Sequence, residues 1–310
     1  MRSRVALPRA RGAPDGLMEL AMQFSVRASL EQFVLPHPGG EGQLKISVAA
    51  PAMAPAGATL PVLYVVDGDF LFGIAAELAR AITSVAAFPP FYVVGIGYDA
   101  DYLDFLKLRT ADLSPPISAE AAAAMGTVGA MVGADRNGGA DRFLAFLADT
   151  LKPEIAARYP GTGGAQILFG HSLGGLFAAH ALLARPDAFS SFIIGSPSLW
   201  WDGFSILGKL PAFAGRLPAP PSQPRVFVGV GGKEQDPPTS VPPGLGVSLE
   251  EAQAQIRASR MVDAAKEFAD ALGTAGGAAL RHVAFAEEDH ASVAASVIIH
   301  GMRFALGRDG

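Results

Sequence analysis

The sequence has 310 residues, of which 50% are hydrophobic and 17% are charged, a balance typical of a chain with a packed core rather than of a disordered one. The formal net charge of -5 supplies none of the positive field that nucleic acids or anionic lipids require, so we expect no nucleic-acid partner. Cysteine is absent, which excludes disulfides, thiolate metal sites and a cysteine nucleophile.

The first residues differ in composition from the remainder of the chain. Residues 1–20 are rich in Arg, Pro and Gly without periodicity, and we expect a disordered arm there, followed by a single domain over residues 21–310. The basic N-terminus lacks the continuous apolar stretch of a signal peptide, and no segment reaches the roughly 18 uninterrupted apolar residues of a membrane span. The sequence therefore predicts a cytoplasmic protein with no membrane partner.

Strand candidates recur along most of the chain. Two β-like runs, at residues 23–28 and 43–49, flank a turn-forming sequence around His37 and predict an antiparallel pair at a sheet edge. From Leu60 onward, short apolar runs alternate with helical stretches, which is typical of a mainly parallel sheet. These runs end at Val66, Gly97, Phe169, Ser196, Gly231 and Ala286. Together they predict an α/β fold with about eight strands and helices on both faces.

Three long helical stretches are predicted, at residues 141–158, 248–272 and 291–306. The first has apolar residues at spacings of three and four, and we expect Pro153 to kink it. The second begins with SLEE, a capping-box sequence. Residues 114–140 and 236–247 fit neither pattern and are expected to be loops.

A candidate nucleophile lies between a short apolar strand and a helix, in the sequence GHSLG at residues 170–174. This G-x-S-x-G pattern is that of a nucleophile elbow, a strand-to-helix turn so tight that glycines must surround the serine. Leu173 would offer its backbone N–H, at the helix N-terminus, to a developing oxyanion. We therefore predict Ser172 as the nucleophile of an α/β-hydrolase fold, with an ordinary glycine-rich turn as the alternative.

A serine nucleophile needs a base, and His290 is the best placed of the six histidines. It follows the last strand and precedes a helix, at the edge where ligands bind in open α/β sheets, although EEDHAS could also be only a helix cap. The triad acid of this fold lies between the serine and the histidine in the chain. Glu234 is the favoured acid and Asp236 the second choice, while a solvated charged turn is the alternative for both.

A second oxyanion donor is expected after the first parallel strand. The turn Asp67-Gly68-Asp69 follows that strand, and the backbone N–H of Asp69 is our candidate, although Asp-Gly also forms ordinary turns. The sequence contains no H-E-x-x-H motif, no closely spaced histidine pair and no glycine-rich dinucleotide motif after the first parallel strand. We therefore predict no metal and no cofactor.

The chain resembles the putative esterase family of the α/β-hydrolase superfamily, which includes enterobactin and salmochelin esterases and, more distantly, antigen 85 mycolyltransferases and S-formylglutathione hydrolase. The resemblance spans most of the chain and rests on YVVDGD at 64–69, RTADLSP at 109–115, FGHSLGG at 169–175, SPSLWW at 196–201 and EEDHAS at 287–292. It implies that Ser172 and His290 are the catalytic pair and that Asp69 and Leu173 supply the oxyanion-hole amides. The segment containing Glu234 lies where the family often places its acid.

Further residues are substrate-binding candidates. By the resemblance, Arg109 lies near the mouth of the active site, where it would hold a carboxylate or catechol oxygen, or else form a structural pair with Asp112. Trp200 and Trp201 follow the strand next to the nucleophile strand and would line an acyl or aromatic pocket, or else pack in the core.

The sequence thus predicts a serine carboxylic-ester hydrolase that forms an acyl-enzyme intermediate. A small-molecule ester is the expected partner, either of a siderophore type or with a small acyl or aromatic group. The alternatives are acyl transfer to an alcohol and a non-catalytic binding module. The oligomeric state cannot be predicted from these patterns.

Overall fold

The computed structural model describes residues 30–307, except 41, 52, 85–87, 99, 127–128, 130–132, 214–215, 219–221, 242–245 and 277–278. The predicted arm over residues 1–20 and the β-like run at residues 23–28 lie outside this part of the chain. The cytoplasmic location, which depends on the N-terminal sequence, stays a prediction. Within the described ranges, no helix combines the length and hydropathy needed to cross a membrane.

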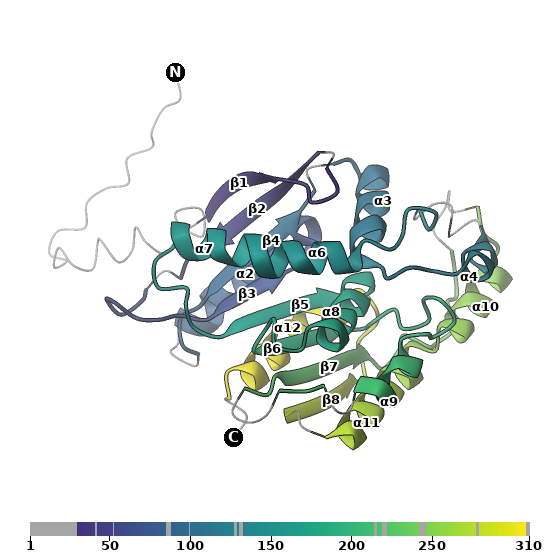
Figure 1. Ribbon diagram of the computed structural model, residues 1–310. Helices are drawn as coiled ribbons and strands as arrows, with labels where there is room; N and C mark the ends of the chain where they lie inside the picture. Colours follow the sequence, from purple (N-terminus) through teal and green to yellow (C-terminus); the bar gives the residue numbers. More distant parts are fainter. Residues whose placement is uncertain are drawn as a thin grey trace, which may run out of the picture.

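The described residues form one eight-stranded sheet with the strand order β1-β2-β4-β3-β5-β6-β7-β8 (Figure 1). The strands are β1 (Leu30–Pro36), β2 (Gln43–Ala49), β3 (Val62–Val65), β4 (Tyr92–Gly97), β5 (Gln166–His171), β6 (Ser191–Gly195), β7 (Arg225–Gly231) and β8 (Ala279–Phe285). The β1–β2 and β2–β4 pairs are antiparallel, and the remaining pairs are parallel. This arrangement confirms the predicted α/β-hydrolase fold.

The edge hairpin contains a strand that the sequence analysis did not identify. β1 begins at Leu30 and pairs with β2, with Phe33 opposite Ile46, across the turn that contains His37. The strand contains polar residues and ends in Pro36, so its pattern is weak. An edge strand tolerates both features, because one of its sides needs no hydrogen-bonded neighbour. Pairing with β2 therefore decides its structure more than its own propensity does.

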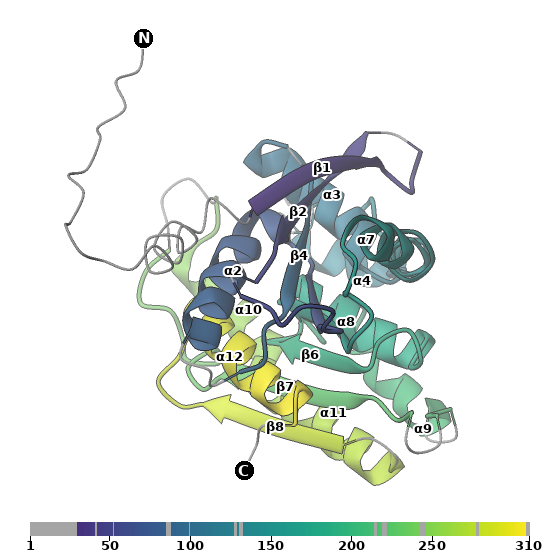
Figure 2. The same ribbon diagram turned by 90° about the vertical axis from the view of Figure 1, so that its left-hand side faces the viewer.

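Helices cover both faces of the sheet (Figure 2). They are α2 (Gly68–Ser84), α3 (Tyr102–Leu113), α4 (Ala119–Ala124), α6 (Ala140–Phe146), α7 (Lys152–Arg158), α8 (Leu173–Ala184), α9 (Leu210–Phe213), α10 (Leu249–Ser259), α11 (Met261–Ala275) and α12 (Val293–Ala305). α2 and α12 pack on one face, with Ala75 and Val297 fully buried against it. α6, α8 and α11 pack on the other face, where Phe143, Phe177 and Phe268 form its core. The predicted loop over residues 114–140 thus includes the short helix α4.

The first predicted long helix is divided by a wider turn. A π-helical turn, Leu147–Leu151, joins α6 to α7, and Pro153 lies in the first turn of α7. Proline has no N–H and its ring clashes with the carbonyl four residues earlier, and a π turn gives that carbonyl room. The expected irregularity at Pro153 therefore takes the form of this turn. The predicted apolar stripe is buried: Leu144, Leu147, Leu151 and Ile155.

The second predicted long helix is in fact two helices. α10 begins with the expected capping box, in which Ser248 and Glu251 bond each other's backbone N–H. It ends at Arg260, whose left-handed conformation (φ 47°, ψ 40°) breaks the helix before α11. No Gly or Pro marks this break, so no local signal predicts it. α10 has no buried residue, whereas α11 packs against the sheet. The break between the two helices lets α10 point away from the sheet.

Candidate active site

Ser172 lies in the turn between β5 and α8, where its backbone has the conformation of a nucleophile elbow (φ 60°, ψ -120°). The neighbouring glycines permit this turn. A Cβ on Gly170 would lie 2.0 Å from the carbonyl oxygen of Gly174, and one on Gly175 would lie 2.3 Å from that of Gly195. Any side chain at either position would therefore push α8 away from β5 and β6.

His290 bridges Ser172 and Glu234. Its Nε2 lies 3.0 Å from Oγ of Ser172, and its Nδ1 lies 2.6 Å from Oε2 of Glu234. The three side chains follow β5, β7 and β8, at the carboxyl edge of the sheet. Asp236, the second candidate for the acid, is exposed and lies two residues beyond the one that contacts His290. The three sequence-predicted residues thus come together from positions far apart in the chain.

Glu234 is buried, and hydrogen bonds from three groups satisfy its carboxylate. Besides the contact with His290, Oε1 accepts bonds from Oγ of Ser196 at 2.5 Å and from the backbone N–H of Gly231 at 2.7 Å. Burial alone would raise the pKa of Glu234, but the bonds from His290, Ser196 and Gly231 outweigh it and hold that pKa below its usual value. The side chain is therefore ionised at neutral pH, and its partner nitrogen on His290 carries a proton.

His171, beside Ser172, holds a neighbouring loop in place. Its Nε2 lies 2.8 Å from the backbone carbonyl of His290, and the two rings lie 4.8 Å apart between centroids. Burial, followed by the charge of His290, lowers the pKa of His171 to about 4. The neutral ring therefore donates from Nε2 to that carbonyl and holds the loop of His290 in place.

The two predicted oxyanion donors lie at the starts of two helices. Leu173 is the first residue of α8, and Asp69 is the second residue of α2. Backbone N–H groups in the first turn of a helix have no acceptor within that helix. The two helix starts are close together, because a Cβ on Gly174 would lie 3.0 Å from Oδ2 of Asp67. The start of α2 therefore lies beside the start of α8, where Leu173 directly follows Ser172.

The turn that precedes α2 is held by ionic contacts. Asp67 adopts a positive φ of 57°, and its carboxylate receives Nε and Nη2 of Arg109 at 2.8 and 2.5 Å. The side chain of Asp69 accepts the N–H of Tyr98 at 2.7 Å and pairs with Lys45 at 2.6 Å. These contacts fix the backbone of the turn that carries the Asp69 amide.

One alternative for Arg109 was wrong, because its ion pair is with Asp67 and not with Asp112. Asp112 instead lies 2.7 Å from Nε2 of His37, in the hairpin turn. Arg109 also does not line the cavity beside Ser172. Its bidentate pair with Asp67, in the turn before α2, could not be foreseen, because it joins residues 42 positions apart.

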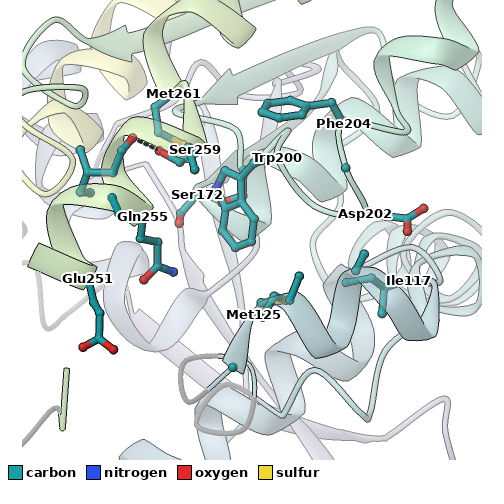
Figure 3. A pocket seen from close by; sticks show the side chains of 18 of the residues that line it. Ile117, Met125, Ser172, Trp200, Asp202, Phe204, Glu251, Gln255, Ser259 and Met261 are labelled. Carbon is teal, nitrogen blue, oxygen red and sulfur yellow. Dashed lines mark hydrogen bonds between the residues drawn. The ribbon is translucent and has the colours of Figure 1, made fainter. Parts of the chain in front are cut away.

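A cavity of about 770 Å³ opens beside Ser172 and His290. Its walls come from α4, from the segment after β6 and from α10, and Figure 3 shows Gln255 and Glu251 on one side and Ile117 and Asp202 on the other. Trp200 lines the cavity as predicted, whereas Trp201 is buried and donates its indole N–H to the carbonyl of Pro115. The following side chains give the cavity its apolar surface: Ile117, Met125, Trp200, Phe204, Ile256 and Met261. The part of the chain that the structure describes has no cluster of three His, Cys, Asp or Glu suited to a metal ion.

The same fold and sequence features occur in known esterases. The "Putative esterase" family model matches residues 40–267. The siderophore triacetylfusarinine C esterase of Aspergillus fumigatus is 34% identical over 88% of this chain and 91% of its own length. Ferri-bacillibactin esterase BesA of Bacillus subtilis is 32% identical over 86% of this chain and 85% of its own length.

Solved structures agree with these relatives. Siderophore hydrolase EstA from Aspergillus nidulans superposes with a TM-score of 0.76 at 25% identity, covering 99% of this chain and all of that one. Siderophore hydrolase EstB from the same organism gives a TM-score of 0.74 at 29% identity, over 91% of this chain and 97% of that one. The chain therefore belongs to the putative esterase family and is a carboxylic ester hydrolase.

Proposed function

We propose that this protein hydrolyses esters through Ser172 as nucleophile, His290 as general base and Glu234 as the acid that orients His290. The observation that carries the proposal is the pair of contacts made by His290, with Oγ of Ser172 at 3.0 Å and the Glu234 carboxylate at 2.6 Å. A serine hydroxyl is a weak nucleophile until a base within hydrogen-bonding distance takes its proton. The ionised Glu234 selects the tautomer in which Nε2 of His290 is free to do so.

In the first half of the reaction, Oγ of Ser172 attacks the ester carbonyl carbon while Nε2 of His290 takes its proton. The imidazolium that forms faces the Glu234 carboxylate, and the carbonyl oxygen becomes an oxyanion. The N–H groups of Leu173 and Asp69 would donate to that oxyanion, and one such donor contributes roughly 3 kcal/mol to transition-state stabilisation. His290 then passes its proton to the leaving alcohol as the C–O bond breaks, which leaves Ser172 acylated.

In the second half, water replaces the alcohol. His290 takes a proton from the water as its oxygen attacks the acyl carbon, and the same two amides would hold the second oxyanion. The proton then returns to Oγ of Ser172 when the acyl bond breaks. A carboxylic acid is released and the starting enzyme is restored, so no cofactor takes part in the balance of atoms and charge.

The substrate that we propose is a siderophore-type ester. Two kinds of support exist: the relatives above are named for siderophore esters, and the cavity of about 770 Å³ lies within the size range that holds a large small-molecule ligand. Trp200, in the cavity wall, would contact the group bound beside Ser172.

A Ser172→Ala variant tests the proposed nucleophile. We expect kcat/KM on p-nitrophenyl butyrate to fall at least about a thousandfold, because the covalent pathway is lost while the fold is kept. Ser222→Ala is the matched control, since Ser222 is an exposed serine just before β7, at the amino edge of the sheet and outside the cavity lining, and it should leave kcat/KM unchanged. If the Ser172→Ala protein has a native circular dichroism spectrum and keeps its activity, the proposal is wrong.

A further inference from the structure

Among the described residues, the cavity beside Ser172 is lined by acidic but not by basic side chains. Three carboxylates line it, those of Asp202, Glu234 and Glu251, and its described lining includes no Lys or Arg. The sequence of the wall segments is also poor in basic residues. Residues 114–134, 196–208 and 236–256 contain no Lys or Arg, and besides the lining acids they include Glu120, Asp236 and Glu250; Arg257, later in α10, is not part of the lining.

The two carboxylates at the sides of the cavity are fixed by backbone donors. Asp202 accepts the N–H of Ser118 at 2.9 Å, and this bond lowers the pKa of Asp202. Glu251 accepts the N–H of Ser248 at 2.7 Å, which lowers the pKa of Glu251. Both side chains are therefore ionised at neutral pH, and Figure 3 shows them on opposite sides of the cavity.

The nearby cations lie outside the cavity lining, although the charge of Lys209 contributes to the lowered pKa of Asp202. Arg257 and Arg260 follow Glu251 along the chain but do not line the cavity, and Arg260 forms an ion pair with Glu267. Lys233, next to the triad acid, pairs with Glu287 at 2.7 Å and is also outside the lining. A ligand in the cavity would therefore meet apolar surface and negative charge.

We propose that the cavity selects esters whose bound part is uncharged and rejects esters that carry anionic groups. An anion in this cavity would lose water against the apolar wall and gain no cationic partner, while Asp202 and Glu251 repel it. This inference rests on the proposed function of Ser172, because it takes the cavity to be where the ester binds. The selection would be a property of the cavity walls and not of the triad.

The inference separates two kinds of iron-chelate ester. Three hydroxamates, each with a single negative charge, neutralise iron(III) and give an uncharged complex. Three catecholates, each doubly negative, leave the complex strongly anionic. Of the two, the cavity fits the uncharged trihydroxamate ester.

A pair of model esters with the same chain length tests the inference. The uncharged probe is p-nitrophenyl pentanoate, and the anionic probe is the mono-p-nitrophenyl ester of glutaric acid, which replaces the terminal methyl by a carboxylate. We expect kcat/KM to be at least about tenfold higher for the uncharged ester at low ionic strength, and the ratio to shrink as added salt screens the wall charges.

Charge-neutral variants then show where the selectivity comes from. Asp202→Asn and Glu251→Gln keep an acceptor oxygen for the Ser118 and Ser248 amides, so both turns should keep their hydrogen bonds. In the double variant, we expect the ratio of the two kcat/KM values to fall at least about fivefold. Glu250→Gln is the matched control: it removes a neighbouring charge on α10 that does not line the cavity, and the ratio should not change.

The outcomes separate the two proposals. If Ser172→Ala abolishes hydrolysis of the uncharged ester but wild type hydrolyses both esters equally well, the cavity inference is wrong and the proposed function stands. An unchanged ratio in the folded double variant also contradicts the inference. If Ser172→Ala keeps its activity, or wild type hydrolyses neither ester, the proposed function fails and the inference fails with it. As a second readout, wild type should cleave an iron trihydroxamate ester faster than an iron tris-catecholate ester, and the reverse order would overturn the inference.

Discussion

Glu234 keeps a negative charge in a buried position because three donors surround it. His290 meets one carboxylate oxygen, and Ser196 and the Gly231 amide meet the other. A buried carboxylate without such partners would take up a proton instead. The exposed ring of His290 is thus held at Nδ1 by the buried Glu234, and its Nε2 faces Ser172.

Glu234→Gln tests this arrangement at the scale of one residue. The amide keeps the shape of the side chain, but its NH₂ group would face Nδ1 of His290 and select the tautomer that cannot accept the Ser172 proton. We expect kcat/KM on p-nitrophenyl butyrate to fall by about a thousandfold or more. Glu287→Gln, an exposed acid near the same loop, is the control and should keep full activity. A Glu234→Gln enzyme with more than about a tenth of wild-type activity would show that Glu234 is not the triad acid.

The sequence allowed some site residues to be predicted and not others. Ser172 and His290 could be found because local patterns mark them: a glycine-flanked strand-to-helix turn and a loop after the last strand. Ser196 and His171 could not, because their roles depend on the pairing of β5 with β6 and on the approach of a loop more than a hundred residues away. The Arg109 partner was missed for the same reason.

At the scale of the element, α8 places Ser172 because it starts in close contact with β6. This contact requires glycine at position 175, where a Cβ would lie 2.3 Å from the Gly195 carbonyl oxygen and 2.9 Å from Cα of Pro197. Both neighbours are backbone atoms, so they cannot move aside as a flexible side chain could. Glycine at position 175 therefore permits the short distance between α8 and β6.

Two identical substitutions in two helices test this packing. Gly175→Ala should lower the free energy of unfolding by about 2 kcal/mol or more, because α8 must move away from β6. Gly73→Ala in α2 has open space around the new Cβ and should raise it by roughly 0.5 kcal/mol, because alanine favours the helix. Urea denaturation of both variants measures the two changes. Equal effects would mean that the contact at Gly175 does not limit the packing.

The elements themselves were predicted with uneven success. Strands β3 to β7 are largely buried, continuous apolar runs between turn residues, so their patterns were clear, whereas β8 is an edge strand with no buried residue. β1 is an exposed edge strand with polar residues, and the left-handed residue between α10 and α11 is an arginine, so neither feature has a local signal. The same break turns α10 into a wall of the cavity, which is why the acids of that wall could not be assigned from sequence.

At the scale of the whole molecule, the active site makes stability depend on pH. Burial lowers the pKa of His171 in the folded protein to about 4, from 6.5 in an unfolded chain. Between these values the unfolded chain binds more protons at this position, so the free energy of unfolding falls as the pH is lowered from 6.5 towards 4. The stabilisation that comes from burying neutral His171 is fully present only above pH 6.5, the pKa of this residue in the unfolded chain.

His171→Gln should remove this dependence. Between about pH 7 and about pH 4, wild type should lose about 3 kcal/mol more of its free energy of unfolding than the variant does. His180 and His282, whose pKa values burial also lowers, are present in both proteins, so their contributions cancel. Denaturant titrations at a series of pH values give the difference, and parallel curves for the two proteins would show that His171 is not buried in a neutral form.

The most direct test of Ser172 is covalent labelling with diisopropyl fluorophosphate, followed by mass spectrometry of the intact protein and its peptides. An activated serine attacks the phosphorus, releases fluoride and keeps the phosphoryl group. We predict one label per chain, on the peptide that contains Ser172, with loss of esterase activity in proportion to labelling, and no label in Ser172→Ala. Labelling at another residue, or full activity after Ser172 is labelled, would contradict the assignment of Ser172 as the nucleophile.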